Sequence, residues 1–517
     1  MLKRRELLLA GLASAGCTPD APSLQGGWVG THPERGHRLR GALPAAGGPA
    51  RKASVIIVGA GIAGLACARE LVRRGVDDIA LLDLEDQAGG NSRSHRLDGS
   101  PCPLGAHYLP LPGDEAREVS ELLHELGLAR SRLGRTEWND RQLCHSPQER
   151  LFIDGEWHES LLPPADDAAT REQYRRFADL VAQAQREAGF AMPTRRAPWT
   201  AAHAALDAQT FAAWLDRAGL DSARLRWYLD YCCRDDFGAD ASGVSAWAGL
   251  HYFASRHGFH APGDETAERE PVLTWAEGNG WLSARMAEPL RERIHLGRSV
   301  LRVTEGRHGV DLQAWNEATG APERWQARAV VLAVPIFIAA RLLAPAPDAL
   351  RIAAGRLSYA PWLTANLLLR EPLLTRPGAP PAWDNVRYGT TALGYVDARH
   401  QSLDPTPRPP LLTAYLALPT TQRSSLLSQP WQHWVRVVGD ELAQIHPDLP
   451  AKLVRADLCR FGHAMSIPTP GLRSSEALAA LGRARGRVVF AHADLASYSV
   501  FEEAYTAGVA AATLLSL

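Results

Sequence analysis

The stretch SVIIVGAGIAGLACARELVRRGVDDIALLDLEDQAGG, residues 54–90, has the order strand, glycine turn, helix, strand and acid. A short β-branched run, 55–58, precedes three glycines with the spacing Gly-x-Gly-x-x-Gly, which are Gly59, Gly61 and Gly64. In such a turn the first glycine permits the sharp bend and the second lets a pyrophosphate approach the backbone. The third glycine lets the following helix pack closely on the sheet. The pattern predicts a dinucleotide-binding unit.

The elements after the glycine turn also suit a dinucleotide. A helix expected over 62–74 would aim the backbone N–H groups of its first turn, at Ala63, toward a phosphate. A second apolar strand, 79–82, ends at Asp83, whose carboxylate is placed to accept hydrogen bonds from ribose hydroxyls. The alternative is an ordinary strand–helix–strand unit that happens to contain a glycine turn.

A second glycine pair indicates which dinucleotide is bound. Gly89 and Gly90 follow Asp83 in the string DLEDQAGGNSRS. This string resembles the second phosphate-contacting turn of the flavin amine oxidase superfamily, which includes monoamine and polyamine oxidases, protoporphyrinogen oxidase and phytoene desaturases. Its members usually have Glu, five residues, then Gly-Gly-Arg. Here Asp83 replaces the Glu, and Asn91 replaces the Arg without its charge, which Arg93 would supply instead.

The C-terminal segment GRVVFAHADLASYSVFEEAYTAGVAAATLL, from Gly486, resembles the closing strand, acid and helix of the same family. The strand is expected over 488–491, and Asp494 stands where relatives carry an acid near the ribityl chain of the flavin. A helix expected over 501–515 would aim its N-terminus at the pyrimidine ring, where a helix dipole favours the negative charge of reduced flavin. The alternative is a terminal unit that only completes the sheet.

Weaker resemblances lie between these two ends. The segment 278–282 resembles a turn that precedes a helix in the family, and the strand 299–303 resembles one whose backbone, near Val300, meets adenine. Another segment resembles the loop beside the flavin ring, and its residues are Gly105, Ala106, His107 and Tyr108. The resemblance implies FAD as the cofactor, bound without a covalent link.

The residues that act on the substrate are less well marked. Amine oxidases of the family usually hold a lysine near flavin N5, and the corresponding position after Pro335 is Arg341, which would anchor a water or an anionic group, or lie on the surface. The family's aromatic pair falls on Val500, beside Phe501, and near His463. His463 also stands where some relatives carry the cysteine that binds flavin covalently, so that link is not expected here. His463 faces the flavin or is a core histidine.

Composition is that of a globular enzyme. The 517 residues support two or three domains, and 46% hydrophobic residues allow a large core. The net charge of −1 gives no argument for nucleic-acid binding, and no cysteine or histidine spacing indicates a metal.

Of six cysteines after residue 17, Cys67 is expected as a buried thiol and the Cys232–Cys233 pair as packing residues. In an exported protein an even number of cysteines is also compatible with disulfides.

The first 17 residues read as an export signal. Basic residues at 3–5 precede an apolar run, 7–15, that is too short to span a bilayer. The adjacent arginines resemble a twin-arginine signal, and Cys17 resembles a lipoprotein cleavage site. We therefore expect a periplasmic or lipid-anchored protein. The alternative is a slightly apolar, disordered N-terminus.

The fold class predicted is α/β, with a Rossmann-like FAD-binding domain and an interleaved α+β substrate domain, as in the amine oxidase-like two-domain fold. The segments expected in order are an export signal (1–17), a linker or wrapping arm (18–53), the first FAD-binding part (54–109), a helical substrate or cover region (110–274), the second FAD-binding part (275–342), the substrate domain (343–481) and the third FAD-binding part (482–517).

The function expected from this resemblance is FAD-dependent oxidation of an amine, a polyamine included, by hydride transfer to flavin N5. Oxygen or a quinone-like carrier would accept the electrons. Two alternatives remain open: a flavin dehydrogenase or desaturase of an apolar or tetrapyrrole-like substrate, and a flavoprotein without turnover that serves as a binding module.

Overall fold

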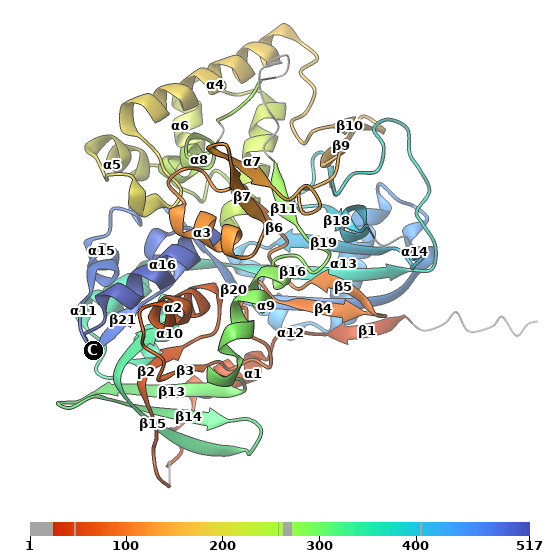
Figure 1. Ribbon diagram of the computed structural model, residues 1–517. Helices are drawn as coiled ribbons and strands as arrows, with labels where there is room; N and C mark the ends of the chain where they lie inside the picture. The colour runs from red at the N-terminus through yellow and green to blue at the C-terminus, as the bar shows by residue number, and fades with distance from the viewer. Residues whose placement is uncertain (1–23, 46–47, 257, 262–270, 404–405, 517) are drawn as a thin grey trace, which may run out of the picture.

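The computed structural model describes residues 24–45, 48–256, 258–261, 271–403 and 406–516. Two large sheets lie side by side below a group of helices (Figure 1). The expected export signal and Cys17 fall outside the described residues. Within the described part of the chain, no helix is both long and apolar enough to cross a membrane.

The seven-stranded sheet combines strands from distant parts of the chain. Its central parallel strands are β3 (Ile79–Leu82), β2 (Arg51–Val58), β15 (Ala321–Leu332) and β21 (Val488–Phe490). The sheet is completed by β12 (Ile294–His295) at one edge and by β14 (Val310–Asn316) and β13 (Arg298–Glu305) at the other. The buried parts of these parallel strands are nearly continuous apolar runs because helices cover both of their faces. The α/β class predicted from the sequence is confirmed.

Two helices pack tightly together on this sheet. Helix α2 (Ile62–Arg73) follows β2, and α16 (Phe501–Leu514) follows β21. A Cβ atom added to Gly508 would lie 2.1 Å from the carbonyl oxygen of Ala63, so only a glycine permits this approach. As a result, the N-termini of both helices are held at the carboxyl ends of the parallel strands.

The eight-stranded sheet is centred on three long strands, β20 (Leu453–Ile467), β16 (Ser358–Leu369) and β19 (Leu411–Ala417). The remaining strands of this sheet are β1 (Gln25–Trp28), β18 (Tyr395–Asp397), β17 (Asp384–Arg387), β9 (Glu149–Ile153) and β10 (Glu156–Glu159). The segment expected as the substrate domain, 343–481, therefore contributes β16, β17, β18, β19 and β20 to this sheet.

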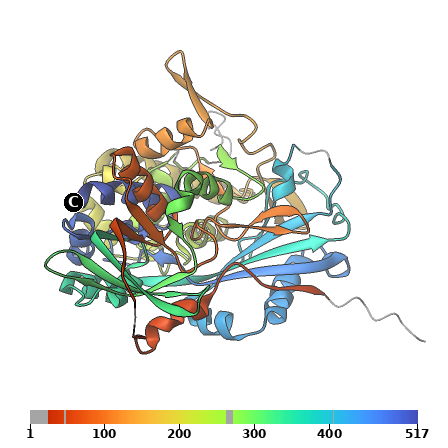
Figure 2. The same cartoon turned by 60° about the horizontal axis from the view of Figure 1, so that its bottom comes forward.

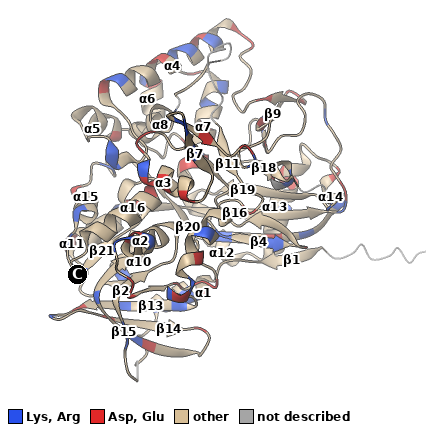
Figure 3. Ribbon diagram, viewed as in Figure 1, with Lys and Arg blue, Asp and Glu red and all other residues tan. Residues whose placement is uncertain are grey.

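Helices cover the top of the molecule, and they are α4 (Ala168–Ala188), α5 (Ala201–Asp207), α6 (Phe211–Arg217), α7 (Ala223–Phe237) and α8 (Ala246–Ala254). They share a core that contains Phe177, Phe211 and Phe253. Acidic and basic residues alternate on the outer side of α4 (Figure 3), as expected for a solvated face.

Shorter elements connect these layers. The strands are β4 (Ser94–Leu97), β5 (Ser100–Pro103), β6 (Tyr108–Pro110), β7 (Ala129–Arg132), β8 (Arg135–Trp138) and β11 (Val272–Thr274). The helices are α3 (Arg117–Glu125), α9 (Gly280–Ala287), α10 (Ile336–Leu342), α11 (Asp348–Arg356), α12 (Arg423–Ser428), α13 (Trp431–Ala443), α14 (Leu449–Lys452) and α15 (Glu476–Arg483).

The described part of the expected linker contains regular structure. Strand β1 pairs in parallel with β20, and a short helix, α1 (Pro33–His37), follows it. Residues 51–53 belong to β2, which begins three residues before the expected boundary at 54. Figure 2 shows this segment (red) running along the outside of the molecule from one sheet to the other.

Candidate active site

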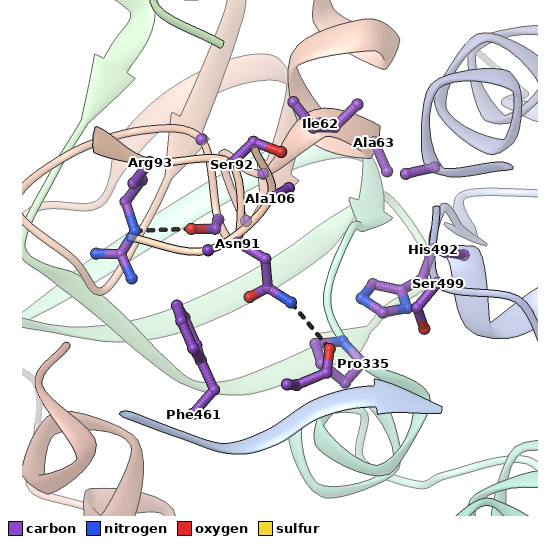
Figure 4. A pocket seen from close by; sticks show the side chains of 18 of the residues that line it. Ile62, Ala63, Asn91, Ser92, Arg93, Ala106, Pro335, Phe461, His492 and Ser499 are labelled. Carbon is purple, nitrogen blue, oxygen red and sulfur yellow. Dashed lines mark hydrogen bonds between the residues drawn. The ribbon is translucent and has the colours of Figure 1, made fainter. Parts of the chain in front are cut away.

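A cavity of about 470 Å³ lies between the two sheets. On one side it is bounded by the ends of β2, β3 and β13, and on the other by residues of β16, β19 and β20 (Figure 4). The N-terminal turns of α2 and α16 both reach it, at Ala63 and Phe501. Neither helix has a side-chain hydrogen bond at its N-cap. The backbone N–H groups in the first turn of each helix are therefore available to a ligand.

Each position of the first turn requires glycine for a different structural reason. Gly59 has a φ of +103°, and a Cβ atom on Gly64 would lie 1.9 Å from the carbonyl oxygen of Gly59. These two glycines are required by the fold itself, and Gly64 does not line the cavity. A Cβ atom on Gly61 would meet only the Cα of Gly90, at 3.8 Å, and would otherwise fill the cavity. Gly61 therefore keeps open a cradle of the kind that a pyrophosphate requires.

The second glycine pair faces the first turn. Gly89 forms a parallel bridge with Gly61, and its N–H donates to the carbonyl oxygen of Ala60 over 2.8 Å. Gly90 has a φ of +58°, which favours glycine. Both residues line the cavity, so the two turns expected to contact phosphates form one continuous surface.

Asp83 lines the cavity and fixes the first turn. Its Oδ2 accepts a hydrogen bond from the N–H of Ala60 over 2.7 Å, and its Oδ1 accepts one from the N–H of Glu85 over 2.9 Å. Burial raises the pKa of Asp83, and these two hydrogen bonds oppose the rise. Each carboxylate oxygen has a second lone pair, which leaves acceptors for ribose hydroxyls.

Arg93 brings a positive charge to the second turn. Its Nε donates to the carbonyl oxygen of Gly90 over 2.7 Å, and its Nη1 lies 3.5 Å from Oε2 of Glu85. The side chain is buried and lines the cavity. Asn91 instead donates through Nδ2 to the carbonyl oxygen of Ala464, over 2.9 Å (Figure 4). The positive charge of this turn therefore comes from Arg93, and Asn91 contributes a hydrogen bond to the opposite wall.

The loop 105–108 forms part of the opposite wall. Gly105, Ala106, His107 and Tyr108 all line the cavity. The His107 ring stacks on Tyr415, with centroids 4.3 Å apart and an interplanar angle of 20°. Burial lowers the pKa of His107 to about 3, so its imidazole is neutral near pH 7. Val300, on β13, lines the cavity as well.

Two acids at the end of α7, Asp235 and Asp236, also line the cavity. The Tyr108 hydroxyl donates to Oδ2 of Asp235 over 3.4 Å, and the Tyr498 hydroxyl donates to Asp236. Arg256 lines the same region of the cavity, and its Nη1 lies 3.8 Å from Oδ2 of Asp236. Burial, followed by the charge of Asp236, raises the pKa of Asp235 to about 7. Sequence reasoning missed this group, although two consecutive acids in an otherwise core-forming helix are a signal for it.

His463, Val500 and Phe501 line the cavity as expected for residues near the substrate. The His463 ring lies 4.7 Å from that of Phe337, centroid to centroid. Burial and then the nearby charge of Arg423 lower the pKa of His463 to about 4. No cysteine lines the cavity among the described residues, and the six described cysteines are free thiols.

Two expected contacts need correction. Asp494 is fully buried behind the cavity wall, where Oδ2 accepts hydrogen bonds from the Ile336 N–H over 2.9 Å and the Tyr359 hydroxyl over 2.6 Å. Burial raises the pKa of Asp494, but the nearby His492 and these hydrogen bonds outweigh that effect and hold it below its usual value. Asp494 therefore fixes the start of α10, and His492 is the residue that reaches the cavity.

The expected position of Arg341 beside the flavin is the second contact that needs correction. It is exposed in the last turn of α10 and does not line the cavity. Ile338 and Leu342, one helical turn apart, occupy the face of α10 that does. Arg341 is therefore not placed to organise water or an anionic group beside a flavin ring.

The first cavity residues along the chain belong to the segment expected as a linker or wrapping arm, for which no site residue was predicted. They are Thr31, Arg35, Gly36 and Leu39. Their signal in the sequence is weak, because no glycine pattern or periodicity marks them.

Comparisons with known proteins agree with this geometry. Residues 62–516 match the family model described as flavin containing amine oxidoreductase. The chain is 28% identical over 284 residues to AofH of Mycobacterium tuberculosis, a proposed flavin-containing monoamine oxidase, and the match covers 54% of this chain and 56% of that protein. The chain thus spans about half the length of the curated relatives that it matches first.

Solved structures share the fold. Putrescine oxidase bound to putrescine has a TM-score of 0.65 at 19% identity, over 90% of this chain and 99% of that one. A fatty acid isomerase from P. acnes, described as producing CLA, has a TM-score of 0.63 at 16% identity, over 88% and 97%. These likenesses show the two-domain fold, which carries more than one kind of reaction.

Proposed function

The chain belongs to the flavin-containing amine oxidoreductases, and from this premise we propose that it binds FAD noncovalently and oxidises a small-molecule amine. The flavin supplies the two-electron chemistry when bound. The protein's part is to hold the cofactor, to bring the amine to the ring and to keep water away from it.

The cofactor proposal is supported by the cradle that a Cβ atom at Gly61 would fill. The residues proposed to hold FAD are Gly59, Gly61, Ala63, Asp83, Gly89, Gly90, Asn91, Arg93 and Val300, and all of them line the cavity. Noncovalent binding is supported by the absence of cysteine from the lining among the described residues. His463 occupies the position that a linking cysteine would need.

The observation that carries the amine proposal is Asp235, an acid that lines the cavity beside Tyr108. Burial and the charge of the neighbouring Asp236 raise the pKa of Asp235 to about 7, so a positive charge placed beside it would stabilise its carboxylate. This wall therefore favours an ammonium over a carboxylate substrate. The Asp235 carboxylate would hold the ammonium and accept its proton, because only the neutral amine gives up a hydride.

A second candidate is a dehydrogenase or desaturase of an apolar substrate. The observation in its favour is that Ala464 and Val500 line the cavity at the positions of the family's aromatic pair, and that Met465 adds further apolar surface. An apolar substrate needs neither aromatic flanks nor a carboxylate. The fold permits this reading, as its likeness to a fatty acid isomerase indicates.

Anaerobic reduction of the flavin distinguishes the two candidates. Purified yellow protein is mixed with monoamines, diamines and apolar carboxylic acids of equal chain length, and loss of the flavin absorbance is followed. Bleaching by amines that is lost in Asp235→Asn supports the proposal. Bleaching by the carboxylic acids alone would contradict it. Reoxidation by oxygen or by a quinone then identifies the acceptor.

We also propose export of the folded, FAD-loaded protein. The support is the sequence alone: Arg4 and Arg5 before a short apolar run, and Cys17 after it. Replacing both arginines by lysine should leave active protein in the cytoplasm. Cys17→Ala should release the protein from the membrane if Cys17 carries a lipid. If the double lysine variant is found in the same cell fraction as the wild type, the segment is not a twin-arginine signal.

A further inference from the structure

The segment 24–45, here called the arm, precedes the residues that match the family and still lines the cavity. The family match begins at residue 62. Four arm residues line the cavity: Thr31, Arg35, Gly36 and Leu39. The arm therefore lies outside the residues that the family model matches and still contributes to the cavity.

One end of the arm is fixed to the eight-stranded sheet. Strand β1 pairs with β20, with Trp28 opposite Leu458, and the N–H of Val29 continues the ladder to the Leu458 carbonyl oxygen over 2.8 Å. The Arg460 guanidinium lies 4.2 Å from the centre of the Trp28 ring. A Cβ atom on Gly26 would lie 1.8 Å from the carbonyl oxygen of Ala456, so the arm lies against β20 without a gap.

The other end is fixed to the residues that follow Asp83. His32 Nδ1 lies 2.7 Å from Oε2 of Glu85. Arg35 donates from Nη1 to the Leu84 carbonyl oxygen over 2.7 Å and makes two hydrogen bonds to Asp86, of 2.7 and 3.1 Å. The hydrogen bond from Arg35 holds the pKa of Asp86 below its usual value. Acidic and basic residues accordingly lie close together beside α1 in the ribbon of Figure 3.

A third contact joins the arm to β13. Arg38 donates to both carboxylate oxygens of Glu317, over 3.1 and 2.8 Å, and Glu317 accepts a hydrogen bond from the Ser299 hydroxyl over 3.1 Å. Ser299 and Val300 line the cavity on this side. The arm, the end of β3 and β13 thus surround one end of the cavity, the end where Asp83 and Val300 would meet adenosine.

We propose that the arm is part of the cofactor site and closes the adenosine end of the cavity over bound FAD. This inference rests on the proposed cofactor and not on the proposed substrate. Arg35 and Leu39 present a guanidinium and an apolar side chain to the adenosine half, and the arm's other contacts hold them there. Because binding couplings are reciprocal, FAD then stabilises the docked arm as much as the docked arm stabilises FAD.

The first test measures cofactor affinity in apoprotein prepared from Arg35→Ala and Leu39→Ser. Each variant should bind FAD at least roughly tenfold more weakly than the wild type. Both should bind FMN as the wild type does, because FMN lacks adenosine. Glu34→Ala is the matched control, since Glu34 is exposed on the same short helix and does not line the cavity. Equal FAD affinity in all proteins, or an equal loss for FAD and FMN, would overturn the inference.

The second test measures hydrogen exchange of the arm with and without FAD. Amides of residues 25–41 should exchange more slowly in the FAD-loaded wild type than in the apoprotein, and this protection should shrink in Arg35→Ala. Identical exchange in both forms would contradict the coupling. A wild type that binds no FAD would overturn the cofactor assignment and this inference together. A loaded protein that oxidises no amine would overturn the amine proposal alone.

Discussion

The Asn91 side chain donates a hydrogen bond of 2.9 Å to the backbone carbonyl oxygen of Ala464. Asn91 follows the second glycine turn, and Ala464 lies on β20 of the other sheet. This bond therefore joins the two walls of the cavity (Figure 4). An arginine at position 91 would bring charge to the turn, whereas the asparagine brings a crosslink and leaves the charge to Arg93.

Asn91→Asp should weaken FAD binding. The carboxylate cannot donate to the Ala464 carbonyl oxygen, and it adds a negative charge beside the proposed pyrophosphate site. A lost hydrogen bond with added repulsion is worth about 1–3 kcal/mol, or a roughly fivefold to 150-fold increase in Kd. Titration of apoprotein with FAD measures this. Asn91→Gln, which keeps the donor, is the control, and equal weakening in both variants would argue against the crosslink.

Gly61→Val should remove FAD binding while the protein still folds. Its φ is −72°, which any residue adopts, and a Cβ atom there meets only Gly90 at ordinary contact distance. The valine side chain instead occupies the cradle. Circular dichroism and thermal unfolding of the apoprotein should resemble those of the wild type, whereas the purified variant should be colourless.

Gly64→Ala provides the contrast. Its Cβ atom would lie 1.9 Å from the Gly59 carbonyl oxygen, so the fold itself must shift. Such overpacking costs about 1–3 kcal/mol of stability. If Gly61→Val unfolds as readily as Gly64→Ala, or keeps its yellow colour, the separate roles assigned to the two glycines are wrong.

The glycine turns could be predicted from the sequence because they depend on local backbone geometry. Gly59, Gly64 and Gly90 are required by a positive φ or by a close approach within one strand–helix unit. Sequence spacing reports such constraints directly. The pairing of β2 with β3 follows from the short crossover through α2, whereas β15, the other neighbour of β2, comes from a distant part of the chain.

The acids and the arm could not be predicted, because their role depends on tertiary packing. Asp235 meets Tyr108 only because α7 packs beside the loop 105–108, more than a hundred residues earlier in the chain. The spacing after Pro335 indicated a position for Arg341 on a helix but not the face of that helix. The sequence marks Asp494 as an acid of the closing segment but not its role, because its partners Ile336 and Tyr359 come from other segments.

Arg341→Met should leave catalysis unchanged. An exposed side chain outside the cavity alters the barrier by at most about 0.5 kcal/mol, or roughly twofold in rate. Stopped-flow rates of flavin reduction and of reoxidation measure both half-reactions. His463→Ala is the positive comparison, because His463 lines the cavity and its loss should alter the flavin spectrum or one of these rates. A large effect of Arg341→Met would mean that α10 presents a different face in the loaded protein.

Asp235→Asn should stabilise the apoprotein more at pH 8 than at pH 4. Burial and the charge of Asp236 raise the pKa of Asp235 from 3.8 to about 7 in the folded protein. A carboxyl group with a raised pKa favours folding while it is protonated, and this contribution is lost as pH rises from the unfolded pKa to the folded one. Each unit of difference in pKa corresponds to about 1.4 kcal/mol at most. Asparagine stays neutral and avoids this loss.

The measurement is the unfolding temperature of wild type and variant across that pH range, with Asp440→Asn as the control, because Asp440 is exposed on α13. The wild-type curve should fall relative to Asp235→Asn between pH 4 and pH 7 and run parallel to it above. The control should follow the wild type throughout. An amine that binds at Asp235 adds a positive charge beside it, so saturating amine should raise the unfolding temperature of the wild type at pH 8 and have a smaller effect on Asp235→Asn. Parallel curves without a pH-dependent gap would show that Asp235 ionises as freely as a surface acid, and the ammonium site would then have to lie elsewhere.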